Sequence, residues 1–151
     1  MKDLLNRALD LARLRGANYA DMRVVHNRTE NIAVRDGVVE SLNSAESEGF
    51  GVRVLVGGAW GFASSRDLTP AEVDRITDQA LEIAHASALV SGERVDLGPA
   101  VTSQGVYITP LRVDPFTVSL EDKLTLLMAA DAAMSKVSGV RTRRSNISLM
   151  R

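Results

Sequence analysis

The sequence predicts an α+β fold, in which an antiparallel sheet of two hairpins is covered by an N-terminal helix and by a second, capped helix. Three observations support this fold class. Apolar residues recur at helical spacing in two segments that flank a β-prone region. Within that region, apolar and polar residues alternate with a period of two. Asp36-Gly37 and Gly57-Gly58 interrupt the alternation where two-residue turns with positive φ would close hairpins.

The N-terminal helix is predicted from an apolar face that ends before Gly16, a residue suited to a C-terminal cap. That face comprises Leu4, Leu5, Ala8, Leu11 and Ala12. A strand is expected to follow from Tyr19. The first hairpin places Ile32 and Val34 before the turn and Val38, Val39 and Leu42 after it. The polar residues 43–49 are expected to form a connection to the next strand.

The stretch "GFGVRVLVGGAWGFAS", residues 49–64, is interpreted as the second hairpin. A phosphate-binding loop would need a helix after the glycines, but strand-like residues follow them and no GKS or GKT occurs. Trp60 and Phe62 share one strand face, where core packing is expected. The glycines thin one face of the sheet, which would also admit another backbone. The candidate contact residues for a peptide or partner are Gly49, Phe50, Gly51, Val52, Arg53 and Val54.

The covering helix is predicted to begin at Thr69, with Pro70 in its first turn and Glu72 completing a capping box. Its inward stripe comprises Val73, Ile76, Ala80, Ile83 and Ala84. Together these elements form an N-terminal α+β domain over residues 1–90. Residues 91–117 are expected to be a linker with a short β segment at "GVYIT".

A third helix is predicted after the linker, capped by Ser119 with Asp122 as its partner. Its apolar positions are Leu120, Leu124, Leu127, Ala130, Met134 and Val137. The following "GVRTRRSNISLMR" alternates like a strand. Residues 118–151 are therefore expected to begin a second α+β domain that is truncated, as in an N-terminal fragment of a longer protein.

Composition narrows the classes of function. The 151 residues are 45% hydrophobic and 25% charged, with a net charge of -1 and no cysteine. This balance is ordinary for a soluble domain and offers no global field to attract nucleic acid. No signal peptide and no membrane-spanning run is recognisable, so a cytoplasmic location is expected.

No residue pattern in the sequence indicates a catalytic or metal site. His26 and His85 have no second ligand at a metal-binding spacing. The carboxylates Glu40, Glu46 and Glu48 fit a solvated rim, and an acid/base pair among them is the alternative. The basic cluster "RTRR", residues 141–144, fits a sheet edge protected by charge, with a nucleic-acid site as its alternative.

An ordered set of segments resembles the N-terminal region of the TldD/PmbA family, which is described as modulators of DNA gyrase and as zinc metallopeptidases of peptidase family U62. The segments are "RGANYADMRV", "VRDGVVES", "GFGVRVLVGGAWGFASSRDLTPAEV", "DPFTVSLEDKLTLL" and "VRTRRSNISLMR". They cover nearly the whole chain. The amino-acid sequence of the third segment is more similar to the TldD branch than to the PmbA branch.

The resemblance implies a longer enzyme that cleaves unstructured peptides in a dimeric chamber, with zinc bound by an HExxxH-type motif downstream of these residues. None of those catalytic residues occurs here, so the expected role of this segment is chamber wall and dimer surface, with no cofactor of its own. Two alternatives stay open: a non-catalytic partner subunit of the PmbA type, and a stand-alone module that binds peptides or gyrase.

Overall fold

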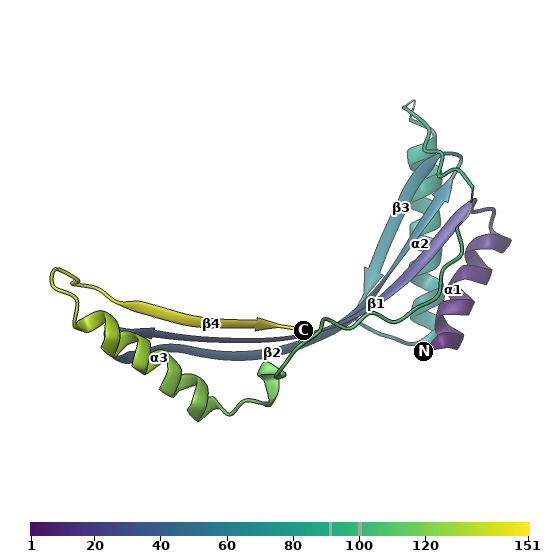
Figure 1. The fold of residues 1–151 in the computed structure, drawn as a ribbon. Coiled ribbons are helices and arrows are strands. Elements are labelled where there is room, and N and C mark those ends of the chain that lie inside the picture. Colours follow the sequence, from purple (N-terminus) through teal and green to yellow (C-terminus); the bar gives the residue numbers. More distant parts are fainter. Residues whose placement is uncertain (91, 100) are drawn as a thin grey trace. The chain divides into compact units, whose positions relative to one another are not determined.

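The computed structural model describes residues 1–90, 92–99 and 101–151. It has mixed α and β secondary structure (Figure 1), and its four strands form one sheet in the order β3-β2-β1-β4. Along the chain the elements are α1 (Lys2–Leu14), β1 (Tyr19–Arg35), β2 (Val38–Val56), β3 (Ala59–Ser65), α2 (Pro70–Ala88), the short 3-10 helix η1 (Pro115–Thr117), α3 (Leu120–Ser135) and β4 (Arg144–Met150). The predicted α+β class is confirmed.

Both predicted hairpin turns are present. Asp36 and Gly37 have φ values of 48° and 77°, and Gly57 and Gly58 have values of 58° and 81°. Positive φ at both central residues is the mark of the tight turn that suits the twist of antiparallel strands. The second turn fixes the register of β2 and β3, so that Leu55 lies opposite Trp60.

The chain divides into two compact units. Unit 1 comprises Met1–Val25 and Glu48–Ser103, and unit 2 comprises His26–Ser47 and Gln104–Arg151. The long strands β1 and β2 therefore contribute residues to both units. The domain bounds expected from the sequence, 1–90, 91–117 and 118–151, stay a prediction.

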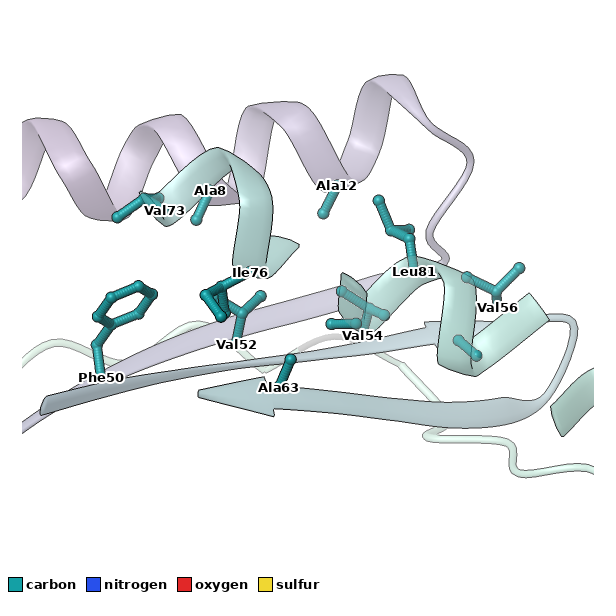
Figure 2. Packing of buried hydrophobic residues seen from close by; sticks show 12 residues of the cluster. Ala8, Ala12, Phe50, Val52, Val54, Val56, Ala63, Val73, Ile76 and Leu81 are labelled. Atoms are coloured by element: carbon teal, nitrogen blue, oxygen red, sulfur yellow. The ribbon is translucent and has the colours of Figure 1, made fainter. Parts of the chain in front are cut away.

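The core of unit 1 lies between the sheet and the two helices α1 and α2. Phe50, Val52 and Val54 point from β2 toward Ile76 and Leu81 on α2 (Figure 2). At α1, Ala8 and Ala12 are completely buried, and Gly16 ends the helix with a φ of 86°. The amides of Gly16 and Ala17 donate to the carbonyls of Arg13 and Ala12, which is a Schellman cap.

Helix α2 approaches β3 closely because the strand carries Gly61 at the contact. A Cβ atom on Gly61 would lie 1.9 Å from the Ala80 carbonyl oxygen and 2.6 Å from the Ala84 amide nitrogen. Ala80 and Ala84 are themselves completely buried. Only glycine fits this position, so the glycine thins the helix-covered face of the sheet.

The predicted cap of α2 is confirmed in part. The Thr69 hydroxyl accepts a hydrogen bond from the Glu72 amide at 3.3 Å. The Glu72 carboxylate does not complete the box, because it accepts two bonds from the Arg75 guanidinium at 2.7 and 2.8 Å. Ile83 is 39% exposed, and Thr77 and Leu81 take its place in the buried stripe.

Unit 2 has a smaller core, in which Ile32 and Val34 of β1 contact Leu127 of α3. The predicted cap of α3 is present: the Ser119 hydroxyl accepts a hydrogen bond from the Asp122 amide at 3.1 Å and donates one to the Asp122 carboxylate at 2.6 Å. The third predicted helix ends at Ser135, short of Val137. The predicted apolar stripe of this helix is only partly buried, since Leu120 is 44% exposed. The buried residues of the helix are Lys123, Leu127 and Asp131.

Two predictions of local structure are wrong. Residues 43–49 are not a connection, because β2 continues through them from Val38 to Val56. A ladder of backbone hydrogen bonds extends through residues that bury no side chain, so alternation of hydrophobicity does not reveal it. The β segment expected at residues 105–109 is absent; Val106, Tyr107 and Ile108 are 90%, 85% and 79% exposed. High β-propensity does not form a strand without a partner.

Candidate functional site

The six candidate contact residues at 49–54 alternate between the two faces of the unit 1 sheet. Phe50, Val52 and Val54 are 3%, 0% and 0% exposed and belong to the core under the helices. Gly51 and Arg53 face the opposite side, which we call the outer face and define by Tyr19, Asp21, Arg53, Trp60 and Phe62. The side chains of the candidate set are thus not brought together on one surface.

The backbone of this stretch is occupied on both sides. β2 lies between β3 and β1 in the sheet, and its residues 50–56 pair with residues 59–65 of β3. A backbone-on-backbone contact with a peptide needs an unpaired strand edge. In the sheet order the edge position next to this stretch belongs to β3.

An ion pair holds Arg53 flat on the outer face. The Nε and Nη2 atoms of Arg53 donate to Asp21 Oδ2 at 2.8 and 2.7 Å. The Asp21 carboxylate raises the pKa of Arg53 above its ordinary value, and the Tyr19 hydroxyl adds to this effect. Arg23 contributes a second cation at 3.3 Å from the Asp21 carboxylate.

Aromatic rings complete this cluster. The Arg53 guanidinium lies 4.6 Å from the centroid of the Trp60 ring, a cation–π contact. Tyr19 meets Trp60 edge to face, with ring centroids 5.8 Å apart and planes at 89°. Three strands thus contribute one connected group, with Tyr19 and Asp21 from β1, Arg53 from β2 and Trp60 from β3.

Phe62 lies on the same outer face and is 58% exposed. Its ring covers Gly51, where a Cβ atom would lie 2.7 Å from the ring. The expectation that Trp60 and Phe62 pack in the core is therefore wrong for Phe62, and Trp60 is only half-buried. The reason is the register, which places Gly61 and Ala63 toward α2 and turns the aromatic residues outward.

A hollow of about 730 Å³ opens beside Trp60 on the outer face. Tyr19, Leu55 and Trp60 form its strand side, and Val95, Leu97 and Pro99 form the side contributed by the segment after α2. The Val95 amide donates to the Gly58 carbonyl oxygen at 2.9 Å, which attaches this segment to the second hairpin turn.

Four of the other charged candidates from the sequence, Glu40, Glu46, Arg143 and Arg144, take part in ion pairs. Glu40 accepts from both Arg35 and Arg144, at 3.2 and 3.1 Å, and Glu46 lies 3.5 Å from Arg28. Arg143 donates to Asp131 at 3.1 Å. These carboxylates and arginines neutralise one another, which fits a solvated rim and a charged sheet edge. His26 lies in unit 2 and His85 in unit 1.

A metal site was tested against the side chains that the structure describes. Among residues 1–90, 92–99 and 101–151, no group of three or more His, Cys, Asp or Glu residues could hold a metal ion. The zinc implied by the resemblance has no fitting donor set among these residues. Within the same residues, no helix has the length and apolar character needed to cross a membrane.

The sequence reasoning missed Tyr19, Asp21 and residues 95–99 as parts of one surface. The signal for part of it was available, because counting outward from Gly57-Gly58 pairs Leu55 with Trp60 and Arg53 with Phe62. The position of residues 95–99 has no such local signal, since it depends on where the chain returns after α2.

The curated proteins that are similar to this chain include metalloproteases. Residues 20–84 match the family model described as PmbA/TldA metallopeptidase domain 1. A metalloprotease of Methanothermobacter thermautotrophicus is 31% identical over 122 residues, which are 81% of this chain and 25% of that protein. The metalloprotease MJ0996 of Methanocaldococcus jannaschii is 26% identical over 111 residues, 74% of this chain and 25% of that protein. The chain thus spans about a quarter of the length of these curated relatives.

Solved structures share the fold. A protein of Bacteroides thetaiotaomicron, described as a proposed modulator of DNA gyrase, superposes with a TM-score of 0.73 at 20% identity, over 97% of this chain and 34% of that one. TldE from Thermococcus kodakarensis superposes with a TM-score of 0.66 at 12% identity, over 97% of this chain and 33% of that one. With the matched first-domain model and the metalloprotease relatives, the chain belongs to the PmbA/TldD metallopeptidase family and corresponds to its N-terminal region.

Proposed function

We propose that this chain is the N-terminal, non-catalytic portion of a TldD-like zinc metallopeptidase that cleaves unstructured peptides and proteins. In that enzyme it forms part of the wall of the substrate chamber and part of the surface toward a second family chain. The match to a first domain and the greater length of the metalloprotease relatives support this proposal. Zinc would be bound by residues outside this segment, and the location would be the cytoplasm.

The observation that carries the chamber-wall role is the outer face of unit 1. It presents aromatic side chains to solvent, with Phe62 58% and Tyr19 37% exposed, on the side of the sheet opposite α1 and α2. Its strand β3 ends the sheet order, so that its second edge pairs with no strand among the described residues. An open edge beside exposed aromatic rings suits an extended peptide, which adds to a sheet through its backbone.

The surface of α3 supports the role in assembly. Apolar residues also occur on the exposed part of this helix: Leu127 is buried, whereas Leu126 is 65% and Leu120 is 44% exposed. Exposed apolar side chains that cluster on a surface helix mark a place where another element or chain binds. A second chain of the TldD/PmbA family is the partner that we propose for this surface.

Photo-crosslinking in the natural, full-length protein tests the chamber-wall role. The exposed Phe62 is replaced by p-benzoylphenylalanine, and the protein is irradiated with an unfolded polypeptide. The control carries the same photoprobe in place of Ile83, which is 39% exposed on α2. The proposal predicts labelling of the polypeptide from position 62 and not from position 83. Equal labelling from both positions, or labelling from position 83 alone, would refute it.

The same reaction discriminates the two alternatives. A PmbA-type partner subunit would label the polypeptide from position 62 only in a preparation that also contains a second, zinc-bearing chain. A gyrase-binding module would label gyrase subunits in a mixture with the polypeptide. Either outcome would replace the TldD-like assignment.

A further inference from the structure

The hollow beside Trp60 has apolar walls and room for a side chain together with the backbone that carries it. Its volume of about 730 Å³ falls within the ~300–1,000 Å³ typical of sites that enclose small ligands. The strand residues Leu55 and Trp60 supply an aliphatic and an aromatic wall, and Leu97 and Pro99 supply the facing wall.

Several polar groups of the hollow have partners within the protein. Arg53 is paired with Asp21 at 2.7 Å and stacked on Trp60, so its charge is not available to attract an anion. The Asp96 carboxylate accepts a hydrogen bond from the Gly98 amide at 2.9 Å. The Asn18 side chain accepts one from the Gly57 amide at 3.2 Å. A negatively charged occupant would lose its hydration here and face the Asp96 carboxylate, and the apolar walls favour an uncharged side chain.

A segment of the chain itself, residues 95–99, lies against this face. Residues 95–99 form no helix or strand and lie against the hairpin through the bond from the Val95 amide to the Gly58 carbonyl. Gly58 permits this approach, because a Cβ atom there would lie 2.7 Å from Arg94 Cβ. Val95 and Leu97 stay 36% and 48% exposed, so this segment leaves the hollow open.

From these observations we propose that the hollow beside Trp60 binds an aliphatic or aromatic side chain of an uncharged, extended polypeptide segment. The inference deepens the proposed function, on which it rests, since it names the class of side chain that the chamber wall would hold. Residues 95–99 would form one wall of the pocket and the outer face would form the other.

Calorimetric titration of the natural, full-length protein tests this proposal. The probes are three capped tripeptides, acetyl-Ala-Leu-Ala-amide, acetyl-Ala-Ala-Ala-amide and acetyl-Ala-Glu-Ala-amide. We expect a saturable heat of binding with the leucine peptide and at least about tenfold weaker binding of the other two, the ratio that burial of a leucine side chain produces.

Two variants locate the site. Leu97→Ser removes an apolar wall residue outside the regular structure, and we expect at least about tenfold weaker binding of the leucine peptide. The matched control is Leu89→Ser, at a leucine that is 88% exposed and does not line the hollow. Its affinity should equal that of the unmodified chain. Circular dichroism spectra of both variants establish that they are folded.

Three results would overturn the inference: no saturable change with the leucine peptide, equal binding of the glutamate peptide, or equal affinities of the Leu97→Ser and Leu89→Ser variants. These results are distinguishable from failure of the proposed function. If crosslinks form at position 62 while the titration fails, the outer face is a chamber wall without this pocket. If both fail, the proposed function fails as well.

Discussion

Replacing Gly61 by alanine should displace helix α2 from the sheet. The added Cβ atom would lie 1.9 Å from the Ala80 carbonyl oxygen, whereas ordinary contacts begin at 3.4 Å. The helix must therefore retreat by roughly 1.5 Å, because both contacting groups are backbone and neither can rotate away. A gap of about 1 Å already forfeits up to about half of a dispersion contact, and overpacking adds about 1–3 kcal/mol. We expect a loss of about 3 kcal/mol or more in the free energy of unfolding.

Urea denaturation, followed by Trp60 fluorescence and by far-ultraviolet circular dichroism, measures this loss. The matched control is Gly51→Ala in the same sheet, where the added Cβ meets the Phe62 ring at 2.7 Å. That ring is 58% exposed and can rotate, so we expect a loss below about 1 kcal/mol. A Gly61→Ala variant as stable as the Gly51→Ala variant would refute the reasoning, since α2 could not then pack on β3 as described.

Two further predictions concern ion pairs. In unit 2, the Lys123 ammonium lies 2.7 Å from the Glu30 carboxylate, and the two side chains are 6% and 15% exposed. Lys123→Met should lower the free energy of unfolding by about 3 kcal/mol because it leaves a buried carboxylate unpaired, and the double variant Lys123→Met/Glu30→Leu should recover most of this loss. Equal stabilities of the two variants in urea denaturation would contradict the buried pair. In unit 1, Arg7 holds the pKa of Asp74 below its ordinary value through two hydrogen bonds of 2.6 Å. The stabilisation is therefore present above the unfolded pKa near 3.8 and is lost as pH falls through the lowered folded value. Asp74→Asn should accordingly reduce stability more at pH 7 than at pH 2, and an equal effect at both pH values would argue against the pair.

Local rules predicted the turns and the caps of this fold. Asp-Gly and Gly-Gly between alternating runs identified both hairpins, and Thr69 and Ser119 identified the starts of α2 and α3. These features are predictable because the contacts that form a turn or a cap join residues no more than four positions apart. Glu72 shows the limit, since a carboxylate within the same turn is bound by Arg75, which lowers its pKa to about 2.

Features that depend on tertiary contacts were not predictable. Residues 43–49 bury no side chain and thus carry no alternating signal, although β2 runs through them. The orientation of Phe62 was missed because apolar character alone does not tell which face of β3 the helix covers. Gly61 marks the face that the helix covers, but this is recognisable only once Ala80 and Ala84 are known to lie against it. The candidate site was likewise predictable only in part: the sequence pointed to Trp60, but nothing in it indicated that residues 95–99 lie opposite this ring.

The intact mass and zinc content of the protein purified from its native source test the central claim most directly. The account predicts a mass well above the 16.3 kDa of this chain, with about one zinc ion per chain. A larger mass without zinc would contradict the TldD-like assignment and favour a PmbA-type partner subunit. A mass equal to that of this chain would contradict the account altogether and leave a stand-alone binding module.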